Sequence, residues 1–185
     1  MVIPSRLLHL LKTNRVGYQT QKHQTAYTAQ EIAAASHVPG RQLAKCVLVN
    51  TDRGPVLAVL PAIYLIDLKK LKTLLRAKTL TIGKEADIKQ RFSDVEVGAM
   101  SPFGNLYQVP VVVDRVLAES AQIVFNAGSH TETIKMAYAD FARLVAPTTG
   151  GFAQQLKPGK HKKKRVKSQK AGKRTGKKKK TSSRR

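Results

Sequence analysis

The chain has 185 residues, of which 34 are Lys or Arg and 11 are Asp or Glu, so its formal net charge is +23. Residues 157–185 hold 16 of the basic residues and no acidic one, which leaves residues 1–156 with a net charge of +7. The single cysteine excludes an internal disulfide and suits a reducing cytoplasm, and no apolar run approaches the roughly 20 residues needed to span a membrane. Partners that fit such a charge are nucleic acid, an anionic membrane surface or acidic proteins.

Apolar periodicity and turn residues predict short helices mixed with short strands. The expected helices span residues 4–14, 28–36, 68–75, 84–92 and 139–145, with N-caps at Ser5, Thr28 and Asp67. The expected strands span residues 18–23, 44–49, 55–60, 80–83, 110–113, 123–125 and 133–136, and the second and third of them form a hairpin. Helices and strands do not alternate in a regular βαβ order. The sequence therefore predicts an α+β fold, in which a mixed, largely antiparallel sheet curls toward a barrel and helices surround it.

The last part of the chain differs in composition from the rest. Residues 148–151 are expected to form a linker, and most of the residues after 156 are Lys, Arg, Gly or Ser. Because a block of like charges stays solvated, residues 1–152 are predicted to form one domain and residues 153–185 a disordered tail. The tail either binds RNA phosphates or is a solubilising or localising segment. Its RNA-binding candidates are Lys162, Lys163, Lys164, Arg165, Lys177, Lys178, Lys179 and Lys180.

Two glycine-bearing segments are candidate ligand-binding loops. They are residues 98–104 and residues 126–130, the second at the end of a predicted buried strand. Glycine lets backbone N–H groups approach a ligand closely, and proline stiffens a loop. The alternative is that both segments are ordinary tight turns. The sequence has no Gly-x-Ser-x-Gly, no His-Glu-x-x-His and no P-loop, and its scattered histidines predict no metal site.

Lys45 lies near the start of the very apolar strand expected at residues 44–49. Its ammonium group either extends to solvent at the strand end or is held in a pocket as a point charge for an anion. Strand alternation places Cys46 on the opposite face, where it is expected to be a small core residue.

Taken together, these segments resemble the YbaK/prolyl-tRNA synthetase editing-domain family, whose members are freestanding or inserted aminoacyl-tRNA deacylases. The resemblance covers residues 5–147, and its matching stretches are residues 25–31, 43–45, 57–61, 97–104 and 125–130. It implies the same curled mixed sheet, a tRNA substrate and an aminoacyl-tRNA synthetase as a further candidate partner. It also implies a cytoplasmic enzyme with no cofactor, no metal and no membrane partner.

The resemblance further assigns roles to individual residues. Lys45 matches the family's essential lysine, which is expected to hold the phosphate or ribose of the terminal adenosine. Residues 98–102 match the Gly-x-x-x-Pro loop that shapes the amino-acid pocket, and Gly128 matches the glycine loop that flanks it. The catalytic candidates are Lys45, Gly98, Ser101 and His130, and the substrate-binding candidates are Cys46, Ala99, Met100, Pro102, Gly104, Asn126, Gly128 and Ser129.

The expected reaction is hydrolysis of the ester between a small amino acid and a tRNA 3′ ribose, a trans-editing step that protects translation fidelity. Backbone N–H groups of the two loops would stabilise the developing oxyanion, and His130 is either a general base or a hydrogen-bonded structural residue. Two other functions stay open at this point. One is a non-catalytic RNA- or ribosome-binding module on the same fold, and the other is a pocket for a different aminoacyl ester or nucleotide.

Overall fold

A computed structural model describes residues 3–25, 31 and 38–155, so the capping box and most of the helix expected over residues 28–36 lie outside the described residues. The helical elements are α1 (Ser5–Thr13), α3 (Leu68–Leu74), α4 (Glu85–Arg91), the 3-10 turn η1 (Gly104–Tyr107), α5 (Arg115–Ala118) and α6 (Tyr138–Val145). The strands are β1 (Tyr18–Lys22), β2 (Leu43–Thr51), β3 (Gly54–Pro61), β4 (Tyr64–Ile66), β5 (Leu80–Ile82), β6 (Val111–Asp114), β7 (Gln122–Ser129), β8 (Glu132–Ala137), β9 (Thr148–Gly150) and β10 (Ala153–Gln155). Over these ranges, each helix is too short or too polar to cross a membrane.

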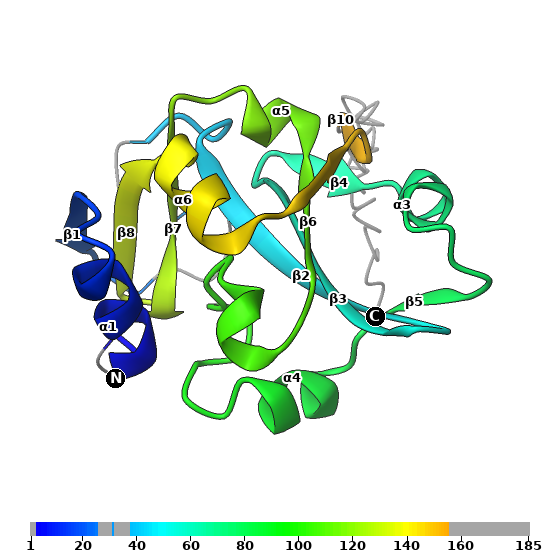
Figure 1. The fold of residues 1–185 in the computed structure, drawn as a ribbon, viewed down its shortest axis with the longest axis horizontal. Helices are drawn as coiled ribbons and strands as arrows, with labels where there is room; N and C mark the ends of the chain where they lie inside the picture. Colours follow the sequence, from blue (N-terminus) through cyan, green and yellow to red (C-terminus); the bar gives the residue numbers. More distant parts are fainter. Residues whose placement is uncertain (1–2, 26–30, 32–37, 156–185) are drawn as a thin grey trace, which may run out of the picture.

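One mixed sheet of eight strands organises the chain. Its strand order is β1-β8-β7-β2-β3-β6-β9, and β5 pairs with β2 beside this path. The pairs β1–β8, β7–β8, β2–β3 and β2–β5 are antiparallel, whereas β2–β7, β3–β6 and β6–β9 are parallel. The sheet curls, but within the described residues β1 and β9 do not pair, so the barrel stays open (Figure 1). The predicted α+β class and mixed, curled sheet are confirmed.

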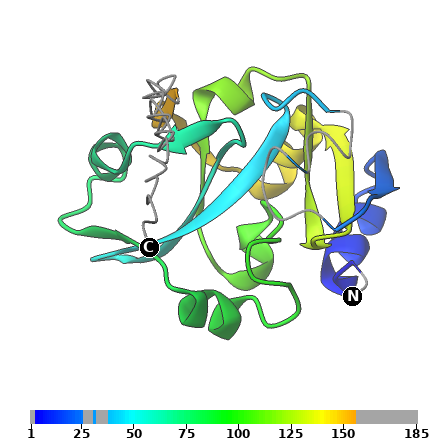
Figure 2. The ribbon, with the colours of Figure 1, turned by 180° about the vertical axis from the view of Figure 1, so that it is seen from behind.

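Helices α1 and α6 cover one face of β1, β8 and β7 (Figure 1). Leu7 and Leu11 of α1 and Phe141 of α6 join Phe125 of β7 and Met136 of β8 in the larger apolar core. A second core lies on the other side of β2, β3 and β6, where α3 packs. Burial of these apolar side chains, worth about 25 cal/mol per Å², is the main force that holds the layers together. The far face of β1, β8, β7 and the start of β2 is turned toward the viewer in Figure 2.

Most predicted elements are present, with some differences at their ends. The hairpin of β2 and β3 is confirmed by a continuous antiparallel register. Asp67 is the predicted N-cap of α3, and its carboxylate accepts hydrogen bonds from the backbone N–H groups of Lys69 and Lys70. The prediction that Ser5 caps the first helix is wrong, because α1 begins at Ser5 and Pro4 holds the N-cap position. Proline fits there because it has no N–H group to satisfy.

The linker predicted at residues 148–151 is wrong. Residues Thr148–Gly150 form β9, which pairs in parallel with β6, and β10 pairs with β4. Between these strands Phe152 is fully buried, and the buried carboxylate of Asp114 accepts its backbone N–H at 2.6 Å. The composition of this Thr-Thr-Gly-Gly segment indicates a weak strand propensity. The tertiary contacts of Phe152 and Asp114 outweigh that propensity, so the segment forms a strand.

Candidate functional site

Strand pairing places a row of polar side chains across β1, β8, β7 and β2, on the face opposite the larger core. The row consists of Gln21, Thr133, Asn126 and Lys45. Asn126 and Lys45 are neighbours in this row because they directly follow Phe125 and Ala44, which pair in parallel. Neighbouring strands lie about 4.8 Å apart, so residues at the same level are close enough to contact one ligand.

Lys45 lies half-buried in this row, and its ammonium group is held by backbone oxygens. Its Nζ donates hydrogen bonds to the backbone oxygen of Tyr64 and, at 3.4 Å, to that of Ala62. Within the described ranges, no Asp or Glu oxygen lies within ion-pair distance of it. Burial lowers the pKa of Lys45, because removing the ammonium from water disfavours its charged form. Carbonyl groups orient this charge but do not neutralise it, so it suits an anionic ligand.

Asn126 supplies the second polar group of the row. The residue is only 9% exposed, and its side-chain oxygen accepts no hydrogen bond from the part of the chain that the structure describes. A buried amide oxygen without a donor costs about 1–3 kcal/mol, so such groups call for an explanation. Its place beside Lys45 makes it a candidate acceptor for a hydroxyl or amino group of the same ligand.

The two glycine segments pack against each other just beyond Asn126. Gly128 donates its N–H to the oxygen of Ala99 at 3.1 Å, and Glu96 donates its N–H to the oxygen of Gly128 at 2.9 Å. Both Gly98, with φ +89°, and Gly128, with φ +99°, adopt backbone conformations that favour glycine. The sequence prediction that residues 126–129 form a loop is wrong in part, because β7 continues to residue 129 with an irregular register typical of a β-bulge.

His130 makes further hydrogen bonds between the end of β7 and the residues just before Gly98. Its Nε2 lies 2.9 Å from the backbone oxygen of Val97, and because a carbonyl can only accept, Nε2 carries the hydrogen. Its backbone N–H donates to the Glu96 carboxylate at 2.9 Å. A Cβ atom on Gly98 would lie 3.4 Å from the His130 ring. These contacts hold the start of the 98–104 loop against the end of β7.

The other predicted residues of the two segments are buried around this connection. The buried residues of the first segment are Ala99, Met100, Ser101 and Pro102. Of these, Met100 is part of the larger apolar core. A Cβ atom on Gly104 would lie 2.5 Å from the backbone oxygen of Val109, so packing accounts for that glycine. Ser129 is buried too, with its Oγ 3.2 Å from the hydroxyl of Thr131.

Cys46 lies apart from the row. It packs against the larger core, on the face of β2 opposite Lys45, as strand alternation predicts. Burial raises the pKa of the Cys46 thiol, so it stays protonated at neutral pH and is a poor nucleophile. Cys46 thus packs as the core residue that strand alternation predicts, and its role in substrate binding stays a prediction.

Sequence reasoning missed Thr133 and Lys135. Alternation along β8 is visible in the sequence, since Ile134 and Met136 are apolar and the residues between them are polar. Alternation predicts which side chains of β8 share one face of the strand, but it does not predict which strand lies next to β8. Only the pairing of β8 with β7 places Thr133 and Lys135 on the same face as Asn126 and close to it. Over the described residues there is no cluster of three or more His, Cys, Asp or Glu side chains that could hold a metal ion.

Fold and site together define a class of protein. It is a small α+β domain whose curled sheet carries a lysine without a carboxylate partner among the described residues, a buried amide and a pair of hydrogen-bonded glycine segments. The family model of the aminoacyl-tRNA editing domain matches residues 23–144. The chain belongs to this family, and the resemblance drawn from its sequence motifs is confirmed.

Solved structures agree with the fold. A candidate trans-editing enzyme for prolyl tRNA synthetase is 18% identical over 83% of this chain and 99% of its own, with a TM-score of 0.73. The hypothetical protein APE2540 is 14% identical over 81% of this chain and 100% of its own, also with a TM-score of 0.73. At such identities the likeness establishes the fold alone.

Proposed function

We propose that this chain is a trans-editing deacylase, which hydrolyses the ester between a small amino acid and the 3′ ribose of a mischarged tRNA in the cytoplasm. The observation that carries the proposal is the half-buried Lys45, held by carbonyl groups and lacking a carboxylate partner among the described residues, in a chain of the editing-domain family. Lys45 would bind the phosphate or ribose of the terminal adenosine. Asn126 would accept a hydrogen bond from a ribose hydroxyl or from the amino group of the amino acid.

The chemistry required is modest, because an aminoacyl ester is already activated. Water adds to the ester carbonyl, the carbon–oxygen bond to the ribose breaks, and the ribose oxygen takes up a proton. The N–H groups of Ala99 and Gly128 already donate to backbone oxygens. The N–H groups of Gly98 and Ser101 have no acceptor among the described residues, so we assign them to the oxyanion. A neighbouring ribose hydroxyl would assist the water, and no metal is required.

His130 contributes to this site chiefly as a positioning residue. Its Nε2 donates to Val97, and its ring packs beside Gly98, so it fixes the loop that carries the assigned oxyanion donors. A general-base role for His130 remains a prediction. The Gly-x-x-x-Pro segment at residues 98–102 would limit the side chain that enters, and pocket size alone separates substrates that differ by one methylene about 10–200-fold.

The test is hydrolysis of alanyl-, seryl-, cysteinyl- and prolyl-tRNA by the full-length protein. We expect release of one or two small amino acids, with rates that are unchanged by EDTA. The matched control is the same panel with correctly folded Lys45→Ala, which should release little. If no member of the panel is hydrolysed while tRNA still binds tightly, the chain is an RNA- or ribosome-binding module instead.

We also propose that residues 157–185 strengthen tRNA binding through phosphate contacts. They carry 16 basic residues and no acidic one, and each phosphate that they neutralise releases counterions. A chain that ends at residue 155 should therefore bind tRNA more weakly and with a smaller dependence on salt, while turnover at saturating substrate changes little. An unchanged slope of log Kd against log salt would contradict an RNA-binding role and favour a solubilising one.

A further inference from the structure

We infer that Lys135 is a second anion-binding point on the same sheet face as Lys45, and that it holds a backbone phosphate of the substrate RNA a few nucleotides from the 3′ end. The inference deepens the proposed function and rests on it for the identity of the ligand. It assigns the direction in which the single-stranded end leaves Lys45, toward β8.

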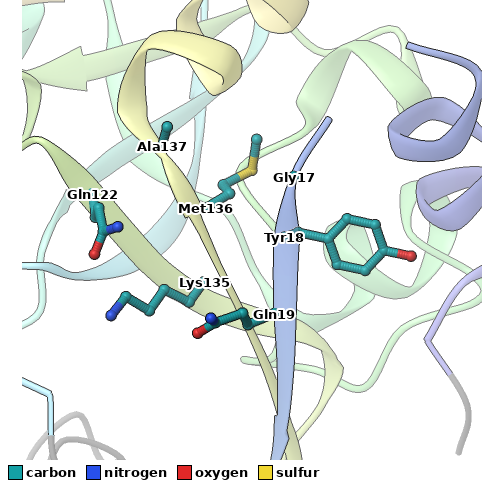
Figure 3. Close-up of a pocket in the computed structure, with 7 residues that line it drawn as sticks. All are labelled: Gly17, Tyr18, Gln19, Gln122, Lys135, Met136 and Ala137. Carbon is teal, nitrogen blue, oxygen red and sulfur yellow. The ribbon is translucent and has the colours of Figure 1, made fainter. Parts of the chain in front are cut away.

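A shallow cavity of about 380 Å³ lies over β1, β8 and the start of β7, and Lys135 is part of its lining. Figure 3 shows the side chains of Lys135, Gln19 and Gln122 on one side of the strands, while the Tyr18 ring extends to the other. Ammonium and amide groups are hydrogen-bond donors that suit phosphate and sugar oxygens.

The charge of Lys135 has no internal partner among the described residues. The side chain is half-buried, no ion pair within 4.0 Å involves it over the described ranges, and no acidic residue lines the cavity. Lys135 is partly buried and has no carboxylate partner among the described residues, so its charge is available to an external anion. An uncompensated cation on a partly buried polar face favours an external anion.

The strand register separates Lys135 from Lys45 by a distance that a few nucleotides can span. Lys135 pairs with Val124 of β7, and Val124 in turn pairs with Leu43 of β2, two residues before Lys45. Two strand spacings and two residues along a strand separate the Cα atoms of the two lysines by roughly 12 Å. Phosphates on one nucleic acid strand are about 3.4 Å apart along a stacked helix and farther apart when extended, so about two to four nucleotides span this gap.

The RNA strand could also leave Lys45 in the opposite direction, toward Arg41, but the residues there are less suited to bind a phosphate. A cavity of about 340 Å³ on the other side of Lys45 is lined by Arg41 and Tyr64. There Arg41 is exposed, and the apolar side chain of Ile63 lines the same cavity. We therefore favour the path toward Lys135, and the variant Arg41→Gln distinguishes the two directions.

The experiment measures displacement of fluorescent adenosine 5′-monophosphate from the full-length protein by the unlabelled monophosphate and by the tetranucleotide ACCA. Only binding at the reporter's site is counted, so RNA held elsewhere on the chain does not contribute. In Lys135→Gln we expect ACCA to bind about 5–10-fold more weakly, with a salt slope smaller by about 0.7, because one phosphate contact is lost. Affinity for the monophosphate should stay unchanged, because a single nucleotide does not reach Lys135.

The matched control is Lys22→Gln, which removes the same charge from β1, next to Glu132 of β8. It should change neither affinity. Equal ACCA affinity in wild type and Lys135→Gln would overturn the inference, and so would a loss seen only in Arg41→Gln. Loss of monophosphate binding in Lys45→Ala tests the proposed function separately, so the failure of one is distinguishable from the failure of the other.

Discussion

Replacement of Lys45 by alanine is expected to lower kcat/KM for the hydrolysed mischarged tRNA by about 100-fold. A hydrogen bond to a charged group contributes about 1.5–3 kcal/mol, and each 1.4 kcal/mol is a factor of ten. The change also removes the donor to the backbone oxygens of Ala62 and Tyr64, so the folded state of the variant must be checked by circular dichroism and thermal unfolding. The matched control is Lys89→Ala on α4, an exposed lysine, which should keep the wild-type rate.

The same lysine predicts a pH dependence with a definite sign. Burial lowers the pKa of Lys45 from its usual 10.5, so the ammonium loses its proton at a lower pH than an exposed lysine does. The charged form binds the anion, and affinity should therefore be full at lower pH and fall as the pH rises through this lowered pKa. Adenosine 5′-monophosphate is the suitable probe, because esters hydrolyse spontaneously in alkali. Lys45→Arg should bind without this alkaline loss, because a guanidinium stays charged.

A failure of either result would change the assignment in a specific way. If Lys45→Ala folds and deacylates at the wild-type rate, then the lysine does not contact the substrate. If the affinity of the wild type for the monophosphate does not fall until the pH reaches the range of an exposed lysine, then the ammonium is fully solvated and extends past the strand end.

Substitution of Gly128 by alanine is expected to lower the free energy of unfolding by about 4 kcal/mol. At φ +99° an L-residue is strained by about 1–3 kcal/mol, and the new Cβ atom would lie 2.6 Å from Cδ of Pro4. Relieving such an overlap costs about 1–3 kcal/mol more, because the close-packed neighbours must move. The measurement is the midpoint and slope of denaturant-induced unfolding.

Alanine substitutions at two other glycines, Gly54 and Gly17, distinguish the cost of backbone strain from the cost of steric overlap. Gly54 has φ +112° but open space around its Cβ position, so Gly54→Ala should cost only the conformational strain, about 1–2 kcal/mol. Gly17 has neither a positive φ nor a close neighbour, and Gly17→Ala should change stability by less than about 0.5 kcal/mol. A Gly128→Ala variant no less stable than Gly54→Ala would show that Pro4 does not pack tightly against the bulge.

Gly128 also illustrates how the site is held in place. Its contact with Pro4 joins the end of β7 to the start of α1, while its hydrogen bonds join it to Glu96 and Ala99. Activity of Gly128→Ala, measured at a temperature where the variant is folded, reports on the loops alone. We expect turnover to fall, because the N–H groups assigned to the oxyanion depend on the position of this segment.

Several features of this protein were determined by its sequence alone. The hairpin of β2 and β3, the Asp67 cap and the opposite faces of Lys45 and Cys46 follow from alternation and local hydrogen bonding, which depend on neighbouring residues only. The family followed from the order of short motifs, each of which is weak by itself. The charge of residues 157–185 is a matter of composition.

Other features depended on contacts between residues far apart in the chain. The short strands β9 and β10 are held by the burial of Phe152 and by the carboxylate of Asp114, so the segment around a Gly-Gly pair forms two paired strands and not a linker. The parallel pairing of β2 with β7 decides that Asn126 lies beside Lys45, and the pairing of β7 with β8 adds Lys135 to the same face. Strand periodicity says which side chains share a face of one strand, but it carries no information about the neighbouring strand, because pairing is decided by the packing of the whole sheet.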